Sequence, residues 1–505
     1  MIDKPFHPPL VAAFFILSVY SSNMDMVPLV HLWIPLGVAF IGAVSVWGLA
    51  ALCWRDISRG AVFASVFLVF FACYAVFEPN LKRFSWLGPP LALWAFITLT
   101  VAALASWKGV WTKFWNTLSL AVVLVAILQA GWTQIRSTHT NGPVAAGRLS
   151  TSIPVTELPD VYYIVLDGFG RTDQLERVMG FSDSDFVKSL ESRGFYVASA
   201  ARSNYCQTEL SVASSLNLDY ITNLVPDASP LASDRAALER LINDNAVYRE
   251  FKSLGYTTVA VTSGFPPIRL EAAENHLDNI DGTTLIESAL IQATPFKVSV
   301  PAQMSMFEER RRYLHRSIDE LQNIGPRQAR PRVVIAHVLA PHPPFVFDAQ
   351  GRSTKSNGLF GYWDGSDFMT FAGTKDDYRT GYRGQAQYIA MRMIETIDKI
   401  LAEPGPSPII ILQGDHGSKL NLDQNDMSKT DLDEVFSILL AARVPETVRA
   451  QLYPTMSPVN VFRLVFQGLF GSDLPVLPDK SSYSPYSHPY EFTDVTGLLK
   501  PGPAH

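Results

Sequence analysis

The spacing of apolar residues changes near residue 133. Before this point they form long runs, and about five of these approach the ~20 residues that a helix needs to cross a bilayer. Beyond a polar stretch they form short β-branched runs that alternate with amphipathic segments, which is typical of an α/β domain. We therefore predict a transmembrane helical domain over residues 1–133, a linker over 134–158, and an α/β domain with a mostly parallel central sheet over 159–505.

The predicted membrane spans carry tryptophans at their ends, where aromatic side chains favour the interface between lipid and water. The spans are 9–22, 31–54, 61–77, 86–107 and 114–132. A cleavable signal peptide is the alternative for the first span. It lacks a clear small-residue cleavage site, however, and further spans follow it.

Basic residues in the short loops give the orientation of these spans. Those on one side are Lys4, Arg55, Arg59, Lys108 and Lys113, and those on the other are Lys82 and Arg83. The positive-inside rule then places the N-terminus in the cytoplasm. Five crossings would deliver the α/β domain to the outside of the inner membrane, that is, to the periplasm.

Composition excludes several classes of function. Hydrophobic residues make up 48% of the 505 residues and charged residues only 17%, with a net charge of −6. This balance, without a long basic run, argues against nucleic acid as a partner. Three dispersed cysteines provide neither a disulfide framework nor a cysteine zinc site. The apolar runs carry no acid–base pairs that would line a transport path.

Short apolar runs predict the elements of the second domain. The predicted strands are 161–166, 257–262, 333–339 and 409–412, and the predicted helices are 182–193, 234–254, 307–323 and 378–401. Asp167 follows the first strand, and Asp415 with His416 follows the last, each beside glycine. Because parallel strands gather their carboxyl ends at one edge, these side chains could meet around a divalent cation. The alternatives are a turn or helix-capping role for Asp167 and a solvated turn at Asp415.

A helix start with small side chains follows Gln207. Such a start offers free backbone N–H groups to an anion. The hydroxyl of Thr208 could attack phosphorus if a metal ion lowers its pKa. Helix starts rich in serine and threonine are also common without catalysis, so a packing role is the alternative.

Four short motifs occur in an order that resembles the alkaline phosphatase superfamily. They are Leu166-Asp167-Gly168, Gln207-Thr208 with the following Ser-Val-Ala-Ser-Ser-Leu run, Pro341-His342-Pro343-Pro344-Phe345, and Gly414-Asp415-His416-Gly417. The sequence is most similar to the sulfatase-like membrane branch, which includes lipoteichoic acid synthases and phosphoethanolamine transferases. The resemblance covers roughly residues 161–417, and the membrane domain also resembles that branch.

The resemblance implies roles for individual residues. Asp167, Thr208, Asp415 and His416 would bind one divalent metal ion, Zn²⁺ or Mn²⁺, and Thr208 would also be the nucleophile. His342 would contact the phosphate or the leaving group, and His337 is a weaker candidate for this role. The branch usually carries glutamate where Asp167 stands, which leaves the metal preference open.

The function implied is a metal-dependent phosphotransferase or phosphodiesterase that forms a covalent phosphothreonine. It would act outside the inner membrane, where a phospholipid headgroup could be moved onto a glycan or lipid acceptor. One alternative is a sulfatase-like hydrolase of other phosphate or sulfate esters, and another is a catalytically silent membrane scaffold. A formylglycine sulfatase would need a Cys-x-Pro-x-Arg setting, and Cys206 lacks both the proline and the arginine. Donor, acceptor and oligomeric state stay open at this point.

Overall fold

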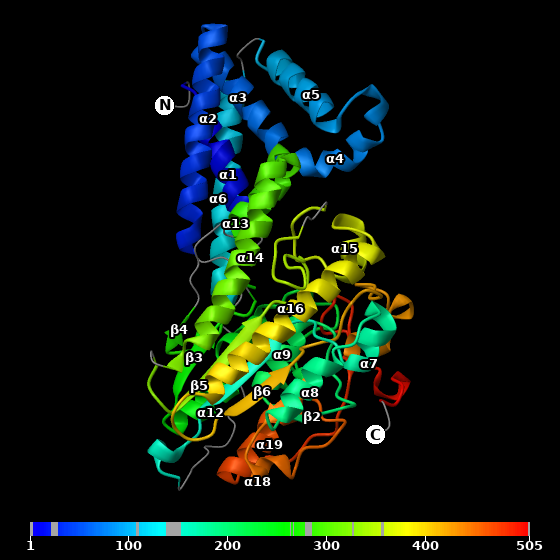
Figure 1. Cartoon of the computed structure of the whole chain (residues 1–505). Helices are drawn as coiled ribbons and strands as arrows, with labels where there is room; N and C mark the ends of the chain where they lie inside the picture. Colours follow the sequence, from blue (N-terminus) through cyan, green and yellow to red (C-terminus); the bar gives the residue numbers. More distant parts are fainter. Residues whose placement is uncertain are drawn as a thin grey trace. The chain divides into compact units, whose positions relative to one another are not determined.

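The computed structural model divides the chain into two compact units (Figure 1). It describes residues 4–21, 29–107, 111–137, 153–262, 264–265, 267–277, 285–325, 328–354 and 358–502. The first unit is Met1–Thr140 with Gly282–Met306, and the second is Asn141–Asp281 with Phe307–His505. The first unit therefore includes Gly282–Met306, from the middle of the sequence. The apolar pattern did not separate this segment from the α/β domain.

The predicted linker, 134–158, lies largely outside the described residues, because 138–152 are not among them. Residues 134–137 belong to the end of helix α6. Lys108, one of the basic residues used for the orientation, also lies outside the described part of the chain. The linker and the orientation stay predictions.

Helices make up the first unit. They are α1 (His7–Ser21), α2 (Trp33–Trp54), α3 (Ile57–Ala72), α4 (Tyr74–Lys82), α5 (Pro90–Ala105), α6 (Thr112–Ser137) and α13 (Leu285–Ala293), and α14 (Val300–Gln322) begins in this unit and continues into the second. Helix α2 is apolar over its full length and turns large side chains outward, with Ile34 69% and Leu52 75% exposed. Such a surface is stable in lipid rather than in water.

Among the described residues, α2 and α6 are long and apolar enough to cross a membrane. A third span exists only if α3 and α4, bent by 65° at their junction, form one broken span. Helices α1 and α5 have 15 and 16 residues. At a rise of about 1.5 Å per residue they are shorter than the ~30 Å hydrocarbon core. The described residues thus contain two or three candidate spans, and the count of five stays a prediction.

The second unit is built on a seven-stranded sheet in the order β2-β7-β6-β1-β5-β3-β4. The strands are β1 (Val161–Leu166), β2 (Tyr196–Val197), β3 (Thr257–Val261), β4 (Asn275–His276), β5 (Arg332–Val338), β6 (Ile409–Gln413) and β7 (Leu440–Arg443). Strand β1 is central and runs parallel to both β5 and β6, whereas β7 pairs antiparallel with β6. The prediction of a mostly parallel sheet is confirmed.

Alternate residues of β1 enter two different cores, as the period of a strand requires. Tyr163 and Val165 pack with residues from α9 (Thr208–Leu216), α11 (Ala236–Asn243), α12 (Ala246–Ser253) and α19 (Pro458–Phe470). Ile164 and Leu166 pack with residues from α8 (Ser184–Ser192), α14 and α16 (Lys375–Leu401). Helices therefore cover both faces of the sheet, which explains why β1 and β6 are buried along their whole length.

The single helix predicted over residues 234–254 is wrong, because the chain forms α11 and α12 there. Helix α11 ends at Asn243, and α12 begins anew after Asn245. The Asn245 side chain accepts a hydrogen bond from the Tyr248 backbone N–H. Asparagine in this capping position starts a helix, and the apolar periodicity continues across the break and hides it.

Candidate active site

The sheet order brings three chain segments to one edge. Strands β6, β1 and β5 are neighbours with parallel directions, so their carboxyl ends lie together. Asp167 directly follows β1, and its backbone N–H donates to the Val338 carbonyl of β5 at 3.0 Å. Asp415 and His416 follow β6. Helix α9 begins at Thr208 and brings its first turn to the same edge.

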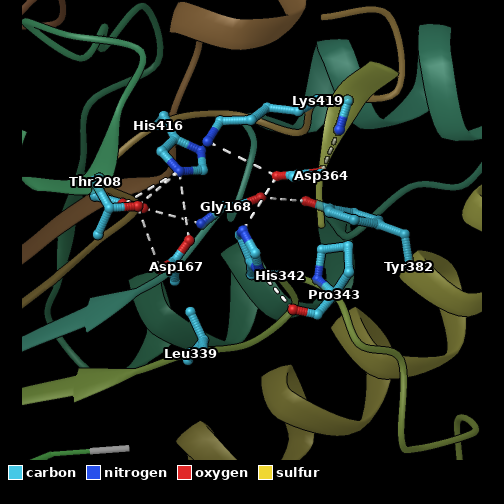
Figure 2. Close-up of polar contacts among 12 residues, drawn as sticks. Asp167, Gly168, Thr208, Leu339, His342, Pro343, Asp364, Tyr382, His416 and Lys419 are labelled. Carbon is cyan, nitrogen blue, oxygen red and sulfur yellow. Dashed lines mark hydrogen bonds and ion pairs between the residues drawn. The ribbon is translucent and has the colours of Figure 1, made fainter. Parts of the chain in front are cut away.

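Asp167, Thr208 and Asp415 each place an oxygen near the Nε2 atom of His416, and Figure 2 shows this arrangement for Asp167 and Thr208. This nitrogen lies 3.4 Å from Asp167 Oδ1, 3.3 Å from Asp415 Oδ2 and 3.2 Å from Thr208 Oγ1. Thr208 Oγ1 lies 3.4 Å from Asp167 Oδ2. Four ligands placed tetrahedrally at about 2.0–2.1 Å from an ion are separated from one another by roughly 3.3 Å. The spacing of these atoms therefore suits a small divalent ion.

The two carboxylates each have an oxygen without a neutralising partner. Asp167 and Asp415 are fully buried, yet Asp167 Oδ1 and Asp415 Oδ2 have no hydrogen-bond partner. Burial, and then the neighbouring Asp415 carboxylate, raise the pKa of Asp167 to about 8. Buried carboxylates without partners must take up a proton or a positive ion. The group of Asp167, Asp415 and His416 thus has the chemistry of a metal site.

The ring of His416 is held in the form that binds metals. Its Nδ1 lies 2.8 Å from the Gly417 carbonyl oxygen, and because this oxygen can only accept, Nδ1 carries the hydrogen. The lone pair is then on Nε2, which faces the two carboxylates. Burial lowers the pKa of His416 well below its usual value, so the ring is neutral.

Ser211, one turn beyond Thr208, anchors the loop that carries the ligands. Its hydroxyl donates to the Asp415 backbone carbonyl at 2.7 Å. The hydroxyl of Ser214 donates to the Asp219 carbonyl instead. Of these three hydroxyls, only Thr208 Oγ1 contacts ligand atoms of Asp167 and His416.

His342 lies on the other side of the site. Its backbone N–H donates to the Asp167 carbonyl at 3.0 Å, which fixes the Pro-His-Pro-Pro loop against β1. Nδ1 contacts the Pro343 carbonyl oxygen, and Nε2 lies 3.4 Å from Asp364 Oδ2. Each ring nitrogen of His342 therefore faces an oxygen atom.

His337, the weaker candidate, lies on β5 with Nε2 3.2 Å from Asp167 Oδ2. The ring is buried, and burial lowers the pKa of His337 to about 4. The ring is therefore neutral, and its contact is with Asp167 Oδ2.

Sequence reasoning missed three residues beside His342: Asp364, Tyr378 and Lys419. Lys419 belongs to the same loop as His416, so the motif itself could have drawn attention to it. Asp364 and Tyr378 belong to no motif. Their proximity to the site arises only from the fold.

No family model and no curated protein matches the sequence. Solved structures that are similar include the zinc complex of the C-terminal periplasmic domain of EptC from Escherichia coli, at 12% identity and a TM-score of 0.44, covering 70% of this chain and 98% of that chain. The integral membrane lipooligosaccharide phosphoethanolamine transferase A from Neisseria meningitidis matches at 13% identity and a TM-score of 0.40, covering 93% and 80%. The phosphonate monoester hydrolase of Agrobacterium radiobacter matches at 15% identity and a TM-score of 0.40, covering 65% and 80%. With TM-scores below 0.5 these alignments do not assign individual residues, so every role below rests on contacts within this chain.

Proposed function

We propose that the chain is a metal-dependent phosphotransferase or phosphodiesterase with Thr208 as its nucleophile. The observation that carries this proposal is the position of the Thr208 hydroxyl. It is the one hydroxyl group that contacts both Asp167 and His416 within the described residues. A hydroxyl among metal-ligating atoms at a helix start is suited to attack on a phosphate ester.

The metal ion would be held by Asp167, Thr208, Asp415 and His416. When bound, it supplies positive charge that favours the alkoxide of threonine and neutralises phosphoryl oxygens. Zn²⁺ and Mn²⁺ are the proposed ions, because mixed oxygen and nitrogen ligands disfavour Ca²⁺.

Asp167 and His342 then serve as the proton acceptor and the proton donor of the reaction. Thr208 Oγ1 donates to Asp167 Oδ2 and thereby has an acceptor for its proton as it bonds to phosphorus. His342 is placed to protonate the leaving alcohol oxygen. In the second half-reaction an acceptor alcohol or water gives its proton to His342 and displaces Thr208 Oγ1 from phosphorus, and Thr208 takes its proton back from Asp167. Transfer follows when the acceptor is an alcohol, and hydrolysis follows when it is water.

A sulfatase-like alternative has no support from Cys206. This thiol is buried and lies 3.9 Å from the Ser484 carbonyl oxygen. It makes no described contact with Asp167, Asp415 or His416. A large distance between Thr208 and Asp415 would favour the silent scaffold, whereas His416 Nε2 lies close to both.

The substrate proposal depends on the membrane helices. Helices α2 and α6 are apolar enough to lie in a bilayer, which makes a phospholipid a natural phosphoryl donor, with a glycan or lipid as acceptor. We place the protein in the inner membrane as a multi-pass protein with a periplasmic catalytic domain. An alkaline phosphatase reporter should be active after Gly502 and inactive after Arg59. The reverse result would overturn this orientation.

The nucleophile is tested with three variants of the full chain in detergent, loaded with Zn²⁺ or Mn²⁺ and assayed on a nitrophenyl phosphodiester. Thr208→Ala removes the attacking oxygen and a ligand, so kcat should fall more than about 10³-fold. Thr208→Ser keeps the hydroxyl and should retain measurable turnover. Ser214→Ala is the matched control on the same helix and should stay close to wild type.

Mass spectrometry of acid-quenched enzyme should find the phosphoryl group on Thr208. Full turnover by Thr208→Ala would refute the assignment of the nucleophile. A wild type that is inactive on every phosphodiester, including headgroup-labelled phospholipids, would favour the scaffold.

A further inference from the structure

Asp364 contacts both His342 and Lys419 beside the candidate metal site. The residue precedes α15 (Gly365–Phe371), and it is 5% exposed. Its Oδ2 atom lies 3.4 Å from His342 Nε2 and 3.8 Å from Lys419 Nζ. Figure 2 shows both nitrogens directed towards this one carboxylate.

The other oxygen of Asp364 is firmly held. Oδ1 accepts hydrogen bonds from the Tyr378 hydroxyl at 2.7 Å and from the Gly365 backbone N–H at 3.0 Å. The Tyr378 hydroxyl in turn accepts from the Lys419 backbone N–H at 3.2 Å. The carboxylate therefore has a fixed orientation, and the loop that carries Lys419 is fixed to the same anchor.

The contacts of Oδ2 are looser than those of Oδ1. At 3.4 Å and 3.8 Å they are ion pairs rather than well-formed hydrogen bonds. His342 and Lys419 are thus held close to Asp364 while their nitrogens stay available to a substrate. Lys419 is itself only 6% exposed, so its ammonium group is kept inside the site rather than in bulk water.

We propose that Asp364 is a positioning residue that orients His342 Nε2 towards the leaving alcohol and holds Lys419 towards the phosphoryl oxygens. This inference rests on the proposed function and adds Asp364 and Lys419 to its site. As the bond from Thr208 Oγ to phosphorus forms, the bond from phosphorus to the leaving oxygen breaks. The Nε2 proton of His342 moves to that oxygen, and the Thr208 proton moves to Asp167. In the second half-reaction the acceptor gives a proton to His342, and Thr208 Oγ1 takes one back from Asp167.

A specific dependence on the leaving group follows. A nitrophenolate leaves readily without a proton, whereas a less acidic phenol or an alkyl alcohol needs one. Weakening the acid should therefore harm poor leaving groups selectively. A variant that merely disturbs the fold would reduce the rate for every leaving group by a similar factor.

The test uses the full chain in detergent, with a series of methyl aryl phosphodiesters whose leaving phenols range from p-nitrophenol to phenol. For Asp364→Asn we expect kcat/KM to fall less than about 3-fold with p-nitrophenol and more than about 10-fold with phenol, within the range of general acid catalysis. Bound metal should equal that of the wild type. Asp367→Asn, a carboxylate in the first turn of α15, is the matched control and should show neither change.

Two further variants separate the roles. His342→Gln should show the same selective loss, and adding Asp364→Asn to it should cause little further change in leaving-group selectivity, because both changes act on the same proton transfer. Lys419→Met should raise KM by a similar factor across the series, and Lys419→Arg should restore part of it. Tyr378→Phe keeps the carboxylate but loosens it, so an intermediate selectivity is expected even if Asp364→Asn folds poorly.

An equal loss on all leaving groups for Asp364→Asn and Tyr378→Phe would overturn the inference, as would no loss for either. These outcomes are distinct from failure of the proposed function. That failure would appear as a wild type without phosphodiester turnover or without phosphothreonine at position 208.

Discussion

The buried aspartates Asp167 and Asp415 differ from the buried Asp364 in how their negative charge is neutralised. Asp167 and Asp415 each leave an oxygen without a hydrogen-bond partner, whereas Asp364 contacts Tyr378 and Gly365 through one oxygen and His342 and Lys419 through the other. Burial raises the pKa of Asp167 to about 8. Burial would also raise the pKa of Asp364, but the His342, Lys419 and Tyr378 contacts together hold it below its usual value.

The difference indicates which part of the site is suited to bind a metal cation. The Asp167–Asp415 pair lacks a positive partner among the described residues that contact its free oxygens, so an added cation would complete it. Asp364 already contacts Lys419 and His342 of the protein. The first pair is thus suited to bind a metal ion, and Asp364 is suited to orient side chains.

The comparison predicts that Asp415→Asn weakens metal binding and that Asp364→Asn does not. This is the largest effect expected. Asp415→Asn removes a charged ligand and should weaken metal affinity more than 100-fold, because loss of an outer partner alone typically costs about 10–100-fold. Turnover should fall with it. Asp364→Asn should keep the metal content of the wild type. Elemental analysis after gel filtration measures both, and metal loss in Asp364→Asn alone would reverse the comparison.

Metal removal should make stability depend on pH. The folded-state pKa of Asp167, about 8, lies above its unfolded value near 3.9, so its contribution to stability is complete below about pH 4 and is lost as pH rises towards 8. One such proton corresponds to a slope of about 1.4 kcal/mol per pH unit. The apparent melting temperature with a chelator should therefore fall between pH 4 and pH 8.

The metal-loaded protein is the control for this experiment, because the ion replaces the proton. Its melting temperature should fall less over the same range, and the remaining fall should come from groups such as Glu434, whose pKa burial raises to about 7. A metal-free protein whose stability does not change with pH would show that the carboxylates are neutralised in some other way.

A smaller effect is expected at Glu434, which holds the loop between the two halves of the site. Its carboxylate accepts from the Ser418 hydroxyl at 2.9 Å, and from Leu420 and Asn421 backbone N–H groups at 2.6 Å and 3.1 Å. Glu434→Gln places an amide NH₂ against these donors and should cost about 1–3 kcal/mol of unfolding free energy. Thermal unfolding checks this, and an unchanged midpoint would mean that the loop is held by other contacts.

Much of the candidate metal site could be predicted from short stretches of sequence. The β-branched runs of β1 and β6 end in Asp-Gly and Gly-Asp-His-Gly, and these local patterns mark where buried strands open into polar loops. Thr208 was placed at a helix start by the small residues that follow it. The apolar runs of the first unit were also visible, but the predicted span 61–77 is broken after Ala72, where α3 ends and the chain bends.

What the sequence by itself determined is the type of each local element and the chemistry at its end, because hydrophobic periodicity and turn residues act over a few neighbours. Only the tertiary structure placed β1 between β5 and β6 and thereby brought Asp167 to Asp415. It alone added residues 282–306 to the first unit and set Asp364 between His342 and Lys419. Such proximities depend on the order of strands and the course of loops, and the neutralisation of a buried charge depends on whichever groups that packing brings within a few ångströms.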